Sequence, residues 1–145
     1  MVSPVRELNS LRHHTHTLRP QPLSPGENPL ADVKGELLEV NAEIALGDAT
    51  EVGFKLRGIP VTYDVLKHVL TCGDRHTSLK PVAGKIQLRM FLDRTSVDIF
   101  GNNGELYMPM GIVIPSDNNA LELSAKGGTA QVESLIVYEL QSAWK

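Results

Sequence analysis

The stretch KIQLRMFLDRTSVDIFGNNGELYMPM, residues 85–110, decides the fold of this chain. Over residues 88–92, aliphatic side chains occupy every second position, which is the period of a β-strand. The polar run 93–96 is short enough for a four-residue hairpin loop. Asn103-Gly104 is the strongest two-residue hairpin signal, because both central residues of a type I′ turn need positive φ. The stretch therefore predicts three antiparallel strands joined by two tight turns.

The two turns also predict which residues face each other across the strands. The expected pairs are Leu92 with Val97, Met90 with Ile99, Phe100 with Tyr107, and Ile99 with Met108. Because a one-residue slip would mix the two sides, the register is expected to be fixed. One side is aliphatic: Leu88, Met90, Leu92, Val97, Ile99, Leu106, Met108 and Met110. The other side, here called the mixed face, combines rings with charged and amide groups: Arg89, Phe91, Asp98, Phe100, Asn102, Glu105 and Tyr107.

The chain that flanks this stretch also has the pattern of β-structure. Further strands are predicted over residues 38–46, 52–56, 61–64, 68–72, 121–125 and 132–140, with a polar loop over 73–84. Short strands at about ten-residue spacing, with turn signals between them, are typical of a β-sandwich. We therefore expect an all-β fold, a two-sheet antiparallel β-sandwich of concanavalin or jelly-roll type, over residues 31–145.

Residues 1–30 have a different pattern. A short helix is predicted over residues 1–11, with Ser3 as its N-cap and Pro4 in its first turn. Residues 12–29 are interrupted by four prolines and a glycine. This composition predicts a linker, or a strap that lies across a surface, and not a core element.

Composition and charge narrow the classes of function. The chain has 145 residues, 41% of them hydrophobic and 21% charged, which suits one soluble domain with a real core. Its net charge of −3 and the absence of a basic stripe argue against nucleic acid as a partner. No apolar run is long enough to span a bilayer, and the N-terminus lacks the apolar core of a signal peptide. A cytoplasmic location is expected if the chain is complete, and a secreted one is open if it is part of a longer protein.

Neither a metal site nor a cofactor is predicted. Cys72 is the only cysteine, so an intrachain disulfide is impossible, and its apolar surroundings predict a buried structural thiol. His13, His14 and His16 form a small cluster, but a structural zinc site needs four ligands and no Cys or carboxylate lies nearby in sequence. We interpret the histidines as exposed polar residues.

Three segments resemble one known family. LRMFLDRTSVDIFGNNGE, residues 88–105, resembles the signature of the C-terminal β-sandwich of glycoside hydrolase family 32, which contains invertases, levanases and inulinases. PVRELNSLR, residues 4–12, is similar to the segment that leads out of the catalytic propeller of those enzymes. VTYDVLKHVLTCGDRHTS, residues 61–78, is similar to a hairpin of their sandwich.

The resemblance implies that the chemistry lies outside this chain. The family carries its nucleophile, transition-state and acid/base carboxylates in a five-bladed propeller, in motifs similar to Asn-Asp-Pro-Asn-Gly, Arg-Asp-Pro and Glu-Cys. None of the three motifs occurs in this sequence. Asp93 and Asp98 could be taken for a catalytic pair, but one begins a turn and the other lies on the charged face, so we interpret both as solvated carboxylates. No catalytic residue is predicted.

Two groups of residues are candidates for binding. The mixed face offers rings for stacking on sugars and polar groups for their hydroxyls; docking of a separate propeller is the favoured alternative, and plain exposure to solvent is the third. The second group is Tyr63, Asp64, Asp74 and Arg75, for which salt-bridged loop residues are the alternative. A similar carbohydrate-binding module that recognises terminal fructose with acidic and arginine side chains adds Asp93 and Arg94 to the second group.

Three hypotheses follow for the function. The first is a non-catalytic sandwich of a fructan- or sucrose-active hydrolase that stabilises or shapes a catalytic propeller. The second is a free-standing carbohydrate-binding module for the terminal fructose of levan or inulin. The third is a homodimeric interaction module that hides the mixed face in its interface.

Overall fold

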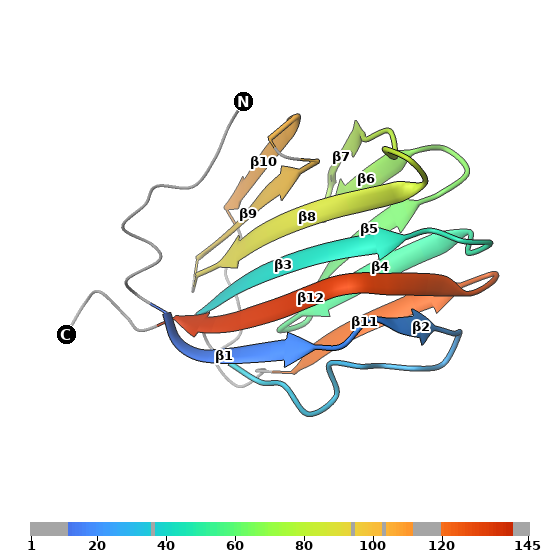
Figure 1. Cartoon of the computed structure of the whole chain (residues 1–145). Helices are drawn as coiled ribbons and strands as arrows, with labels where there is room; N and C mark the ends of the chain where they lie inside the picture. The colour runs from blue at the N-terminus through green and yellow to red at the C-terminus, as the bar shows by residue number, and fades with distance from the viewer. Residues whose placement is uncertain (1–11, 36, 94, 103, 112–119, 141–145) are drawn as a thin grey trace.

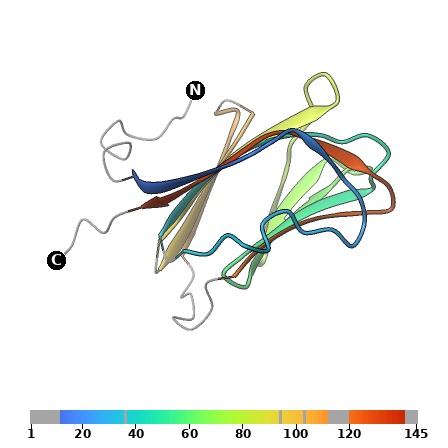
Figure 2. The same ribbon diagram turned by 60° about the horizontal axis from the view of Figure 1, so that its bottom comes forward.

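The computed structural model describes residues 12–35, 37–93, 95–102, 104–111 and 120–140. Over these residues the chain is built from strands, and the strands form two antiparallel sheets. Figure 1 shows the larger sheet in front of the smaller one, and Figure 2 shows the same two layers after a turn of 60°. The predicted two-sheet antiparallel sandwich is confirmed. Within the described ranges, no helix is long and apolar enough to cross a membrane.

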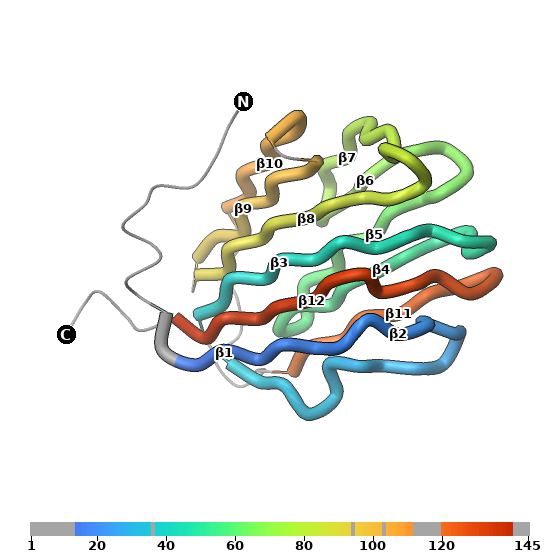
Figure 3. The backbone as a smooth tube through the Cα atoms, in the orientation of Figure 1, coloured from blue at the N-terminus to red at the C-terminus, as the bar shows by residue number. Residues whose placement is uncertain are grey.

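The larger sheet has the strand order β1-β12-β3-β8-β9-β10, with β2 paired to β12 beside β1. Its strands are β1 (Arg12–Leu18), β2 (Gln21–Leu23), β3 (Leu38–Ala45), β8 (Lys85–Leu92), β9 (Ser96–Gly101), β10 (Leu106–Gly111) and β12 (Ala130–Leu140). The smaller sheet has the order β11-β4-β5-β6-β7. Its strands are β4 (Glu51–Leu56), β5 (Ile59–Asp64), β6 (Val69–Cys72), β7 (Arg75–Ser78) and β11 (Leu121–Lys126). The tube in Figure 3 shows β1, β12, β3 and β8 lying side by side.

The core lies between the two sheets because each strand turns every second side chain inward. In β9 the burial pattern alternates strictly, with Val97 and Ile99 fully buried. The same alternation in β11 buries Leu121 and Leu123 from the opposite sheet. Side chains from the two inner faces form one continuous apolar cluster, the usual core of a sandwich.

The register predicted for the decisive stretch is confirmed. Leu92 pairs with Val97, and Phe100 pairs with Tyr107. Gly104 has a φ of 89°, as the predicted turn requires, and its neighbour Asn103 lies outside the described residues. All eight residues of the predicted aliphatic side are buried: Leu88, Met90, Leu92, Val97, Ile99, Leu106, Met108 and Met110.

The N-terminal part differs from the expected strap. Residues 12–18 and 21–23 form β1 and β2, and both strands pair with β12. They therefore belong to the larger sheet and not to a linker. The prolines are compatible with this position, because Pro20 lies between the two strands and Pro22 lies in a short outer strand, where a missing N–H is tolerated. The helix predicted for residues 1–11 lies outside the described residues.

The expected polar loop over residues 73–84 is also corrected. Residues 75–78 form the short strand β7, which pairs with β6 and ends the smaller sheet. Its side chains are largely exposed, so the segment is polar because it is an edge strand and not because it is a loop. A charged edge also discourages pairing with other chains.

Candidate functional site

The larger sheet has an outer face, the side turned away from the smaller sheet, and cross-strand pairing arranges its side chains in rows. One row runs from β12 to β10 as Tyr138, Glu39, Phe91, Asp98 and Pro109. The next row runs in the same direction as Ile136, Asn41, Arg89, Phe100 and Tyr107. Five of the seven residues predicted for the mixed face therefore lie on the outer face, on β8, β9 and β10, whereas Asn102 and Glu105 lie between β9 and β10.

The aromatic rings of the mixed face form one contiguous cluster. Phe100 stacks on Tyr107, with ring centroids 4.8 Å apart and an interplanar angle of 19°. Phe91 meets Phe100 edge to face at 6.0 Å, and the guanidinium carbon of Arg89 lies 5.8 Å from the centroid of Phe91. Tyr107 remains 47% exposed, which is high for a large ring in a packed cluster. The rings thus support one another and leave Tyr107 available to a partner.

Asp98 is the carboxylate inside this aromatic cluster. Its Oδ1 lies 3.4 Å from the hydroxyl of Tyr107, which is a long and weak hydrogen bond. Partial burial raises the pKa of Asp98, the hydrogen bond from Tyr107 lowers it, and the charge of Asp93 raises it. The charge of Asp98 in turn raises the pKa of Tyr107. Asp98 therefore sits where its own negative charge is poorly compensated.

The sequence interpretation missed a buried glutamate beside this cluster. Glu39 is 0% exposed although it lies on the outer face, and it accepts hydrogen bonds from Arg89 Nε at 3.2 Å and Nη2 at 3.0 Å. The amide of Asn41 donates to the same carboxylate at 3.0 Å. The Oδ1 of Asn41 is buried and has no hydrogen-bond partner in the part of the chain that the structure describes.

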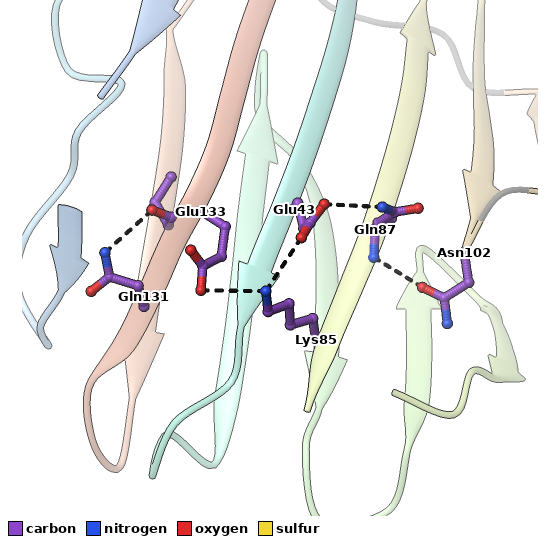
Figure 4. Close-up of polar contacts among 7 residues, drawn as sticks. Glu43, Lys85, Gln87, Asn102, Gln131 and Glu133 are labelled. Atoms are coloured by element: carbon purple, nitrogen blue, oxygen red, sulfur yellow. Dashed lines mark hydrogen bonds and ion pairs between the residues drawn. The ribbon is translucent and has the colours of Figure 1, made fainter. Parts of the chain in front are cut away.

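A second polar group lies farther along the same strands. Lys85 lies 3.7 Å from both Glu43 and Glu133, and Gln87 donates to Glu43 at 3.0 Å. Figure 4 shows these side chains on adjacent strands, with Asn102 beside Gln87. Because Lys85 and both carboxylates are substantially exposed, these pairs contribute little to stability. This end of the outer face is an ordinary solvated surface.

Asn102 is a structural residue, and its predicted role in sugar binding is not supported by its position. It is only 6% exposed and has a φ of 47°. Its Nδ2 donates to the carbonyl of Lys80 at 2.7 Å, and its Oδ1 accepts from the backbone N–H of Gln87 at 2.9 Å. Both ends of the side-chain amide are thus used to hold the β9–β10 turn against neighbouring segments.

We expect Asn102→Ala to lower the free energy of unfolding by about 2 kcal/mol, because two partly buried hydrogen bonds to the backbone are lost and alanine tolerates positive φ poorly. Urea unfolding followed by circular dichroism measures this. Asn102→Gly is the matched control, since it relieves the backbone strain but still removes both hydrogen bonds. An alanine variant as stable as the wild type would contradict the structural role.

Tyr63 is also buried, which corrects its place among the candidate binding residues. It is 1% exposed, and its hydroxyl donates to the carbonyl of Leu79 at 2.5 Å. Burial, followed by the charge of Asp64, raises the pKa of Tyr63 to about 12. A ligand on the surface does not reach this ring.

The raised pKa of Tyr63 predicts a loss of stability at high pH. An unfolded tyrosine has a pKa of about 10, so the folded protein binds the phenolic proton more tightly. The resulting stability is fully present below pH 10 and is lost as the pH rises through about 12. Urea unfolding at pH 7 and pH 11 should show about 1 kcal/mol more loss for the wild type than for Tyr63→Phe. Equal losses in the two proteins would contradict this assignment.

The remaining members of the second group do not converge on one site. Asp64 accepts the backbone N–H groups of Leu66 and Lys67 at the turn after β5. Arg75 donates from Nη1 to the carbonyl of Pro109 at 3.1 Å, which joins the edges of the two sheets. Pairing places Asp64 at one end of the β5–β6 ladder and Arg75 at the far end of β6.

The other predicted site residues lie on turns. Asp74 is exposed between β6 and β7, and Glu105 is exposed before β10. Asp93 is exposed at the β8–β9 turn, where its backbone N–H donates to Ser96. Arg94 lies outside the described residues. Of the candidates, the structure brings together Arg89, Phe91, Asp98, Phe100 and Tyr107.

The structure shows the surroundings of Cys72, His14 and His16. Cys72 is buried, as predicted. His14 is exposed, whereas His16 is partly buried and lies 2.6 Å from Glu139, which links β1 to β12. In the described ranges, no group of three or more metal-binding side chains occurs.

Comparisons with known proteins give a consistent result. The family model described as "Glycosyl hydrolases family 32 C terminal" matches residues 7–139. The levanase of Bacillus subtilis (strain 168) is 32% identical over 166 residues, which cover 98% of this chain and 24% of the levanase. An extracellular exo-inulinase of Aspergillus awamori is 34% identical over 70 residues, covering 48% of this chain and 13% of that protein.

Solved structures share the fold. The crystal structure of exo-inulinase from Aspergillus awamori matches with a TM-score of 0.74 at 23% identity, covering 94% of this chain and 31% of that one. Fructan 1-exohydrolase IIa from Cichorium intybus matches with a TM-score of 0.70 at 14% identity, covering 97% of this chain and 38% of that one. The regions that match this chain thus make up 13–38% of the length of these proteins.

Proposed function

The chain belongs to the C-terminal domain family of glycosyl hydrolases family 32, and from this premise we propose that it is the non-catalytic β-sandwich of a longer enzyme that hydrolyses fructan or sucrose. In that enzyme it packs against a catalytic propeller and stabilises it. The observation that carries the proposal is the match over residues 7–139 to a domain that is a minor part of a levanase, 24% of its length.

Two features of the chain support a role without catalysis. Retaining glycosidases need two carboxyl groups about 5 Å apart on a rigid site, one of which acts as an acid. Asp98 is partly buried on the mixed face, whereas Asp93 and Glu105 are exposed on turns. The buried Glu39 is neutralised by Arg89 at 3.0 Å and is covered from solvent, so no substrate reaches it.

Activity assays test the proposal directly. The 145-residue chain, mixed with sucrose, levan or inulin, should release no fructose, and the enzyme that contains the chain should release it. Deleting this domain from that enzyme should lower the temperature at which the catalytic part unfolds. Fructose release by the purified chain alone, or a catalytic part whose stability is indifferent to the deletion, would overturn the proposal.

Binding of terminal fructose is a second candidate function, favoured by the exposed ring of Tyr107 next to Asp98. Isothermal titration calorimetry with fructose and levan oligosaccharides tests it. Heat at millimolar ligand that disappears in Tyr107→Ala would support a sugar site. Sedimentation of the free chain would show at the same time whether a homodimer covers the mixed face.

A further inference from the structure

Asp98 lies at the centre of an aromatic and apolar frame. Cross-strand pairing places Phe91 on one side of it and Pro109 on the other. Phe100 and Tyr107 follow in the adjoining row. The frame partly shields the carboxylate from water, and the hydroxyl of Tyr107, 3.4 Å away, offers it a long hydrogen bond. A carboxylate in such a setting is stabilised strongly by any cation that enters the frame.

Within the described ranges, no lysine or arginine forms an ion pair with Asp98. Arg89, a cation on the same face, is held by Glu39 at 3.0 Å and lies over the ring of Phe91. The charge of Asp93 acts on Asp98 unfavourably and raises its pKa. Among the residues that the structure describes, the negative charge of Asp98 is therefore left without a paired cation.

The aromatic rings beside Asp98 also favour a cation. Electron-rich ring faces attract cations, and the planar guanidinium also stacks on tyrosine. Tyr107 lies on the edge strand β10, is stacked by Phe100 on one side, and is 47% exposed. An exposed ring beside a poorly compensated carboxylate fits a guanidinium, which can stack and donate hydrogen bonds at the same time.

We propose that the mixed face around Asp98 and Tyr107 binds an arginine side chain of the catalytic domain, so that charge complementarity positions the sandwich on its partner. This inference rests on the proposed function and specifies the chemistry of the contact. A sugar fits the same place less well, because the rings of Phe91, Phe100 and Tyr107 pack against one another and do not form a broad flat platform. Arginine is also enriched at protein interfaces relative to the rest of the surface.

A titration of the 145-residue chain tests the chemistry. N-acetyl-L-arginine amide should shift the backbone amide resonances of β9 and β10, and the neutral isostere N-acetyl-L-citrulline amide should not. Asp98→Asn should weaken the response to the arginine probe about tenfold. Glu122→Gln removes an exposed carboxylate from β11 and is the matched control, with no expected change. Equal shifts with citrulline, or shifts with levan oligosaccharides and none with arginine, would overturn the proposal.

Hydrogen exchange on the longer enzyme tests separately whether the domain docks through this face and whether an arginine makes the contact. Peptides that span β9 and β10 should exchange more slowly in the enzyme than in the free chain, and Asp98→Asn should remove this protection while Glu122→Gln retains it. Equal exchange of these peptides in the wild-type enzyme and in the free chain would show that the domain does not dock through this face. Protection that survives both Asp98→Asn and Tyr107→Ala would leave the proposed function intact and reject the arginine contact.

Discussion

Replacing Ile99 with alanine is expected to lower the free energy of unfolding by about 4 kcal/mol. Ile99 lies in the middle of β9, is 0% exposed, and pairs with Met90 on one side and Met108 on the other. Truncation leaves a cavity in the core beside Met90 and Met108, which the flanking strands cannot close because both are fixed by their own ladders. The cost therefore includes the lost burial and the cavity. The midpoint of urea unfolding measures the effect.

The neighbouring residue provides the control for Ile99. Phe100 points to the outer face, so Phe100→Ala removes a larger side chain from a partly exposed cluster and should cost about half as much. A register slipped by one residue would reverse the two results, because it exchanges the faces of every side chain. A larger effect at Phe100 than at Ile99 would therefore contradict the whole register of the stretch.

A single sequence reveals contacts between residues that lie close together along the chain. The pairs Leu92–Val97 and Phe100–Tyr107 could be predicted because each depends on a turn a few residues away. Tyr63 shares its parity with the buried Val61, so alternation alone could have placed its ring in the core. Local patterns are thus sufficient to predict which face of each strand is buried.

Long-range pairing explains what the sequence interpretation missed. Glu39 meets Arg89 because β3 lies beside β8, and nothing local to either strand indicates that neighbourhood. In the same way, β1 becomes a strand because β12, more than a hundred residues away, provides its ladder. The structural role of Asn102 was missed for a different reason, since an amide at a turn can bond backbone groups or bind a ligand, and the local sequence does not distinguish the two.

Replacing Arg89 with methionine should lower the free energy of unfolding by about 3 kcal/mol. Methionine retains much of the apolar volume but leaves the carboxylate of Glu39, which is 0% exposed, without the guanidinium that donates two hydrogen bonds to it. A buried carboxylate that loses its partner is costly because water cannot replace the lost interactions. Urea unfolding at neutral pH measures the loss.

Two further variants isolate the ion pair. Lys85→Met removes a cation of similar exposure on the same strand, whose carboxylate partners lie 3.7 Å away and are themselves exposed, so it should cost at most about 0.5 kcal/mol. Combining Glu39→Gln with Arg89→Met should restore most of the stability that Arg89→Met loses, because the charge and its partner are then removed together. A double variant as unstable as the sum of its single changes would mean that Arg89 stabilises the sheet by packing over Phe91 and not by neutralising Glu39.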